Sequence, residues 1–120
     1  MKIVDRKTFL ALPAETLFSK YEPCIFGDLT IKGENAGSND FLTQQIVNAV
    51  SCHDSGEFGD ILHSAVETGD SFSMDLDCQG RDGLFDDGQL FAIWEPADIA
   101  MLIERLRLIV GPNVLFCGGP

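Results

Sequence analysis

Residues 89–94 (QLFAIW) constrain the possible folds of this chain more than any other segment. Apolar side chains stand at successive positions, so both faces of an extended segment would be apolar. A strand of this kind needs cover on both faces, as strands in the middle of a covered sheet have. The sequence therefore predicts a central or doubly covered strand over residues 89–94.

Three further segments predict strands. Residues 16–21 are expected to form a strand closed by Glu22 and Pro23, with residues 24–32 as its partner. Over residues 72–78, apolar and polar positions alternate, which predicts one buried and one solvated face. The apolar positions are Phe72, Met74, Leu76 and Cys78. A turn region rich in glycine and aspartate, residues 79–88, follows this segment.

Four segments predict helices. The first covers residues 6–11 and is capped by Asp5, and a polar loop over 33–39 leads to the second, which starts at Ser38, Asn39 or Asp40. The third covers residues 57–68, from a Ser55 cap to Gly69, and the fourth runs from Pro96 to Gly111. The expected inward positions of the last three are, in turn, Phe41, Leu42, Gln45, Ile46, Ala49 and Val50; Phe58, Ile61, Leu62, Ala65 and Val66; and Ile99, Leu102, Ile103, Leu106 and Ile109.

The order α-β-β-α-α-β-β-α predicts an α+β fold: a mainly antiparallel sheet of about four strands with helices packed on it. With 120 residues, 45% of them apolar and nine phenylalanines, the chain can bury a core. We expect one domain over residues 1–120, in which residues 114–120 could add a short strand.

The net charge of −11 is confined to residues 54–98, which hold twelve carboxylates and one base, Arg81. The other 75 residues hold seven acids and seven bases, which cancel. This balance disfavours nucleic acids and anionic membranes as partners and favours basic ones.

The sequence predicts a cytoplasmic protein with reduced thiols. No apolar stretch approaches the roughly 20 residues that span a bilayer. A secretory signal needs an uninterrupted apolar region, and Asp5, Arg6 and Lys7 interrupt the apolar residues near the start of this sequence. The four cysteines are widely separated and do not form a disulfide framework.

The motifs favour a protein without catalytic activity. Neither a Gly-x-Ser-x-Gly nor a His-Glu-x-x-His motif occurs in the chain. Cys52 and His53 are adjacent, so their side chains would diverge on a helix. A Cys–His nucleophile assembled by the fold remains an alternative.

No cofactor is expected, although two kinds of weak metal site remain open. Zinc could use soft ligands, but no Cys-x-x-Cys pair joins any of them. These ligands are Cys24, Cys52, His53, Cys78 and Cys117. Residues 75–86 (DLDCQGRDGLFD) resemble an EF-hand calcium loop, but Asp82 takes a position that is usually apolar, and Asp86 replaces the long bidentate glutamate.

The leading hypothesis is an acidic binding surface. Glu57, Asp60 and Glu67 are expected on the polar side of a helix, and Glu95 and Asp98 near the start of another. The remaining carboxylates are predicted to bind a basic protein that handles nucleic acid, and so to mimic nucleic acid. These partner-binding residues are Asp70, Asp75, Asp77, Asp82, Asp86 and Asp87.

Two alternatives come from other classes of function. A pocket between sheet and helices could bind a small molecule or nucleotide through Lys20, Tyr21, Lys32 and the loop over 33–39. A divalent cation, or a metal-dependent enzyme, could instead use the aspartate-rich turn over residues 75–87. The sequence sets no oligomeric state.

Five stretches of the chain carry a resemblance to known proteins. They are FLALP (9–13), TLFSKYEP (16–23), FGDLTIKG (26–33), GRDGLFDD (80–87) and LFAIWE (90–95). In them the chain resembles small accessory proteins encoded by bacteriophages and prophages. The resemblance implies a setting in the host cytoplasm, where such proteins often inhibit host defence; several anti-CRISPR proteins are acidic mimics of nucleic acid. It assigns no functional residue.

Overall fold

A computed structural model describes residues 1–111 of the protein. The fold is α+β, as predicted, and residues 1–111 form three helices and seven strands, with all of these strands in one sheet. In chain order the elements are β1 (Lys2–Val4), α1 (Arg6–Leu10), β2 (Thr16–Glu22), β3 (Ile25–Phe26), β4 (Thr30–Asn35), β5 (Phe41–Gln45), α2 (Ser55–Thr68), β6 (Gly80–Arg81), β7 (Leu90–Ile93) and α3 (Pro96–Val110). The strand expected over 114–120 lies outside the described residues.

The sheet is antiparallel at every strand pair of the described chain and has the order β1-β7-β2-β4-β5-β6, with β3 also paired to β2. β7 lies between β1 and β2, and Phe91, Ala92 and Ile93 are all buried. This confirms the central strand predicted from residues 89–94. Its apolar residues at both parities are covered on both faces of the sheet.

The core is a cluster of phenylalanine rings between α1 and one face of the sheet. Asp5 caps α1 by accepting from the Thr8 backbone N–H (2.8 Å), as the sequence predicts. Phe9 of this helix stacks on Phe91 with ring centroids 3.9 Å apart, and meets Phe18 and Phe41 edge-on. Four fully or almost fully buried rings thus join α1 to β2, β5 and β7.

The helix expected from residues 38–40 onward is wrong, because β5 occupies this segment. Its apolar residues fit helical spacing, but pairing with β4 and β6 decides the conformation. Asp40 is buried just before the strand and is held by Arg81, 41 residues later in the chain. Such distant contacts override a local pattern.

The hairpin expected over residues 16–32 forms with a break in its second strand. Residues 24–32 are divided between β3 and β4, which both pair with β2. Cys24 has a φ of 67° in the tight turn before β3, and Gly27 and Asp28 lie outside any strand. β4 then continues to Asn35, so half of the polar loop expected over 33–39 is strand.

The strand expected over residues 72–78 is also wrong. Only Met74 forms an isolated bridge, with Val50, and the rest of the segment is irregular. Phe72, Met74 and Leu76, predicted to face inward, are 41%, 49% and 49% exposed. Within residues 1–111 no strand packs over this segment, so its alternating apolar side chains have no core to face.

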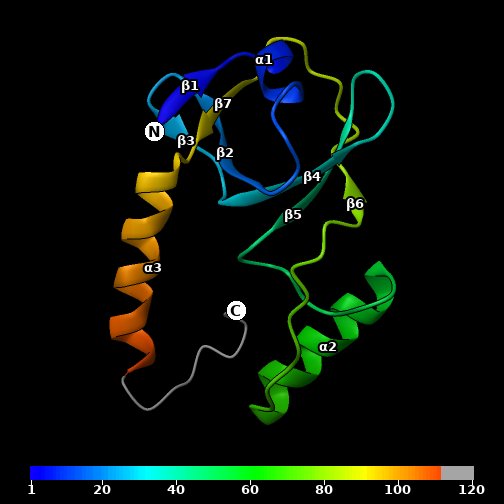
Figure 1. Cartoon of the computed structure of the whole chain (residues 1–120). Helices are drawn as coiled ribbons and strands as arrows, with labels where there is room; N and C mark the ends of the chain where they lie inside the picture. Colours follow the sequence, from blue (N-terminus) through cyan, green and yellow to red (C-terminus); the bar gives the residue numbers. More distant parts are fainter. Residues whose placement is uncertain (112–120) are drawn as a thin grey trace.

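The two long helices form where expected but bury less than predicted. α2 is capped by Asp54 instead of Ser55 and ends at Gly69, whose φ of 74° suits glycine. Neither α2 nor α3 contains a fully buried residue. Val66 of α2, expected inward, is 86% exposed. Figure 1 shows α3 extending away from the sheet, so its apolar stripe does not pack on the sheet as predicted. No helix within residues 1–111 has the length and apolar character needed to cross a membrane.

Candidate functional site

The face of the sheet that carries the phenylalanine core becomes polar toward its other end. Side chains two residues apart on a strand share a face, and so do residues paired across strands. Phe18 pairs with Thr30 and Lys20 with Phe91, which places Lys20 and Thr30 on the same face as the core. Thr43, two residues after Phe41, continues this face on β5. One face therefore contains both the core and a polar region beyond it.

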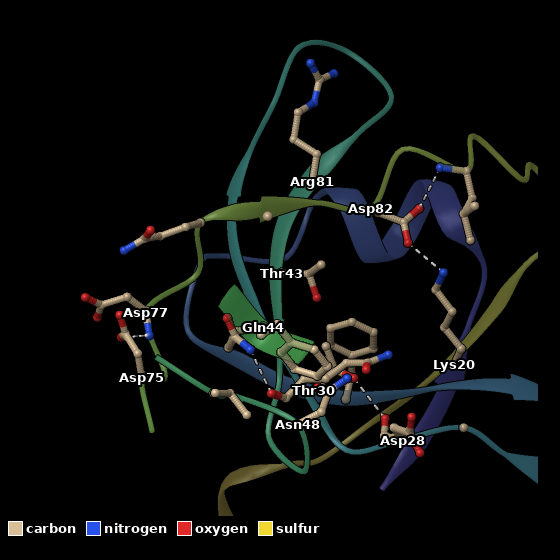
Figure 2. A pocket seen from close by; sticks show the side chains of 18 of the residues that line it. Lys20, Asp28, Thr30, Thr43, Gln44, Asn48, Asp75, Asp77, Arg81 and Asp82 are labelled. Atoms are coloured by element: carbon tan, nitrogen blue, oxygen red, sulfur yellow. Dashed lines mark hydrogen bonds and ion pairs between the residues drawn. The ribbon is translucent and has the colours of Figure 1, made fainter. Parts of the chain in front are cut away.

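A pocket of about 730 Å³ lies over this polar region. Its walls come from β2, β4 and β5, from the segment after α2, from β6 and from Phe58 of α2. Figure 2 shows Thr43 near the centre of the pocket, with Asp75 and Asp77 at one edge and Asp28 at another. The volume is in the range of about 300–1,000 Å³ that is typical of small-molecule sites.

Asp82 forms a buried ion pair beside the pocket. Its backbone N–H donates to the Phe41 carbonyl (3.0 Å), which fixes its position after β6. The carboxylate is 5% exposed, accepts from Lys20 Nζ (2.6 Å, Figure 2) and lies 3.8 Å from the buried Arg6 guanidinium. Asp82 was predicted to face a partner, but it is used inside the fold.

A second buried carboxylate, Asp40, holds the neighbouring loop. It accepts from the Gly83 backbone N–H and from Arg81 Nε, both at 2.9 Å. The Gly83 hydrogen bond is the main cause that lowers the pKa of Asp40, and Arg81 adds to it. The Arg81 side chain is therefore paired with the Asp40 carboxylate, and in Figure 2 it extends away from the pocket centre.

The other predicted partner-binding residues are spread along the chain after α2. Asp70, Asp77, Asp86 and Asp87 are exposed, and Asp75 is partly buried. In Figure 1 this chain runs from the end of α2 up to β6 and on toward α1, over much of the length of the molecule. Asp86 accepts from the Gly88 backbone N–H (3.0 Å) and shapes its own turn. These residues do not form one compact face.

The acidic surface is instead concentrated on residues 46–79, which we call the acidic lobe. This segment contains α2 and the extended chain on either side, joined by the Val50–Met74 bridge and by hydrogen bonds such as Asp75 N to Ala49 O (2.7 Å). It holds seven carboxylates and neither lysine nor arginine. They are Asp54, Glu57, Asp60, Glu67, Asp70, Asp75 and Asp77. The carboxylates of α2 thus belong to the same segment of the fold as those after the helix.

The residues predicted for a nucleotide site do not come together. Lys20 lines the pocket, whereas Tyr21 and the loop over 33–39 do not. Lys32 is buried beside the core, where its Nζ donates to Asn35 Oδ1 (2.9 Å) and lies 5.7 Å from the Phe9 ring centroid. Burial lowers the pKa of Lys32.

Within residues 1–111, no group of three or more histidine, cysteine, aspartate or glutamate side chains is placed to hold a metal ion. Residues 75–86 therefore do not form an EF-hand loop, and the soft ligands of this region do not form a zinc site. Cys78 instead packs against the core sheet, and burial raises the pKa of its thiol. Cys117 lies outside the described residues.

Several pocket residues were missed in the sequence, namely Asp28, Thr43, Gln44 and Asn48. Three of them fall in the segment expected to be helical, where their common surface could not be recognised. A strand over residues 41–45 would have placed Phe41 and Thr43 on one face, and this alternation was the available signal.

No protein-family model, curated protein or solved structure matches this chain significantly. The fold and the surfaces described above are thus the basis for any functional proposal.

Proposed function

We propose that the protein is a non-catalytic binding protein whose acidic lobe docks on a basic surface of a partner protein. The observation that supports this most directly is the composition of the lobe: seven carboxylates, no lysine or arginine, and exposed apolar side chains among them.

The lysines and arginines of the chain do not neutralise the lobe, in which two of the carboxylates, Glu57 and Glu67, contact His53 and His63. Of the eight lysines and arginines, Arg6 and Lys32 are buried, and Lys20 and Arg81 are paired with the buried carboxylates Asp82 and Asp40. The other four lie on β1, α1 and α3. A surface with one sign of charge speeds association with a surface of the opposite sign.

The apolar side chains favour a protein as the partner. Phe72, Met74 and Leu76 are between 41% and 49% exposed, next to Asp70, Asp75 and Asp77 in the sequence. Carboxylates that served only solubility would not require them. Protein interfaces combine apolar contacts at their centre with a polar rim.

A basic surface that normally contacts nucleic acid phosphates is the most suitable target for such a lobe. An inhibitor of host defence, the setting that the sequence resemblance implies, would gain from occupying a nucleic-acid-binding surface. In this proposal the lobe and the nucleic acid compete for one basic surface.

The proposal is tested by capture from a bacterial lysate with the immobilised protein and two charge-reversal variants. Asp60→Lys/Asp70→Lys changes the lobe at exposed positions without ion-pair partners in the described chain. Glu22→Lys/Glu34→Lys is the matched control on β2 and β4 and changes the net charge equally. We expect the control, but not the lobe variant, to retain the wild-type partner.

The captured partner is then purified and titrated with duplex DNA in the presence of the protein. Displacement of the protein by DNA supports a shared basic surface. Equal capture by both variants, or binding that DNA leaves unchanged, would overturn the respective part of the proposal.

A further inference from the structure

We propose that the pocket over the polar end of the sheet binds an organic cation, a guanidinium or ammonium group carried on a flexible apolar stem. This goes beyond the docking role of the acidic lobe, because the pocket includes β2, β4 and β5, whereas Asp60 and Asp70 of the lobe lie outside it.

The charge of the pocket lining favours a cation. Lys20 and Asp82 neutralise each other, and Arg81 is paired with Asp40. Asp28, Asp75 and Asp77 then remain, and none of them has an ion-pair partner within residues 1–111. An anion such as a nucleotide phosphate would be repelled by these three carboxylates.

The spacing of these carboxylates favours an extended cation with several donors. As noted above, they are not placed to share a metal ion. A guanidinium group has five N–H donors, and a polyamine has several ammonium groups along its length, so either can reach acceptors at separate edges of the pocket.

The pocket also contains polar groups that lack a protein partner. Thr43 Oγ1 is fully buried without a hydrogen bond to any described residue. The side-chain amides of Gln45 and Asn48 are exposed at the pocket and make no hydrogen bond within residues 1–111, so they are open to a ligand. A buried hydroxyl without a partner costs free energy, and a rotation of the Thr43 side chain that brings Oγ1 to a ligand in the pocket would recover this cost.

Apolar side chains in the same lining suit the stem of such a ligand. Val50, Phe58 and Leu84 contribute accessible apolar surface to the pocket walls. Their arrangement beside the carboxylates matches an alkyl chain that ends in a charged group. The same chemistry occurs in a free polyamine and in an arginine side chain of a partner protein.

The test is an NMR titration of the ¹⁵N-labelled full chain with Nα-acetyl-arginine amide, with spermidine, and with Nα-acetyl-citrulline amide as the neutral control of equal shape. We expect both cations to shift the backbone amides of residues 43–48 and 75–80, and citrulline amide to leave them unchanged. Tighter binding of spermidine identifies a free polyamine as the source, and tighter binding of arginine amide identifies a side chain.

Two variants separate ligand binding from structure. Asp28→Asn/Asp75→Asn is expected to weaken cation binding about tenfold, while Asp60→Asn, outside the pocket, leaves it unchanged. Thr43→Val is expected to weaken binding and at the same time raise the Tm, because it removes a buried hydroxyl without a partner.

Equal shifts with citrulline amide, an absence of shifts with both cations, or binding unaffected by Asp28→Asn/Asp75→Asn would overturn the inference. Asp75 and Asp77 belong to both the pocket and the acidic lobe, so docking of the lobe is tested separately at Asp60 and Asp70, which lie outside the pocket.

Discussion

At the scale of single residues, the aspartates of this chain have two distinct roles. Asp40 and Asp82 are buried and paired with bases that come from distant parts of the sequence. Asp70 and Asp77 are exposed and form no ion pair within residues 1–111. Composition alone treats these four carboxylates alike, whereas the fold buries the first two side chains and leaves the others exposed on the lobe that we propose as the docking surface.

The substitution Asp82→Asn is expected to destabilise the protein by about 3 kcal/mol, because it leaves Lys20 and the buried Arg6 without their counter-charge. The exposed Asp77→Asn is expected to change stability by less than about 0.5 kcal/mol. Urea unfolding followed by circular dichroism measures both. Similar losses for the two variants would contradict the buried role of Asp82.

Lys32 gives a pH-dependent prediction, because burial lowers its pKa below the usual 10.5. At pH values below the pKa of Lys32 in the folded protein, its amine is charged in both the folded and the unfolded state. The folded state then bears the full free-energy cost of desolvating this charge. This cost is released as pH rises through the folded pKa toward the unfolded value. Wild-type stability relative to Lys32→Met should therefore increase as the pH rises from neutral toward the usual lysine pKa of 10.5.

Urea unfolding of both proteins at each pH gives this difference, and subtraction removes the titration of other groups such as Cys78. At neutral pH we expect Lys32→Met to be at least as stable as wild type, by up to about 1 kcal/mol. A relative stability that falls with pH would show that Lys32 gains a charge partner on folding.

At the scale of elements, the sequence predicts secondary structure best where the local residue pattern agrees with the tertiary contacts of the segment. The apolar run of β7, the Asp5 cap of α1 and the Gly69 end of α2 are all present. β5 was missed because Phe41, Leu42 and Gln45 fit a helix, while the contacts that favour the strand come from β4 and β6. The pocket residues Thr43 and Asp28 were missed for the same reason: their surface exists only once the strands are paired.

Helix α3 shows how an amphipathic pattern can predict the element but not its packing. Leu106 is 44% exposed on the stripe that was expected to face the sheet. We expect Leu106→Gln to cost less than about 1 kcal/mol, since glutamine is a good helix former. Phe91→Ala, in the ring cluster, should cost about 3–5 kcal/mol.

Thermal and urea unfolding compare the two variants directly. If Leu106→Gln were as destabilising as Phe91→Ala, α3 would belong to the core, as the sequence pattern alone suggests.

At the scale of the whole molecule, the fold separates charge that the sequence mixes. Basic side chains are buried, paired with buried carboxylates, or placed on β1, α1 and α3. The acidic lobe projects at the other end of the molecule from α1, as Figure 1 shows. The predicted surface from Asp70 to Asp87 is therefore revised: it loses Asp82 to the interior, while the carboxylates of α2 share the lobe with Asp70, Asp75 and Asp77.

Salt should weaken docking by the lobe, because exposed charges are screened within about 10 Å at 0.1 M salt and about 3 Å at 1 M. Titration calorimetry with the purified partner at both concentrations measures this dependence. Equal affinity at the two concentrations would indicate that the apolar side chains, and not the carboxylates, provide the association.

The most direct test of the docking role is the Kd of the purified partner for the two double variants at about 0.1 M salt. We predict that Asp60→Lys/Asp70→Lys raises the Kd at least about tenfold over wild type, while Glu22→Lys/Glu34→Lys stays within about twofold. Both proteins have the same net charge, so the comparison depends on where the charge lies. Equal Kd values for the two variants would contradict the assignment of docking to the acidic lobe.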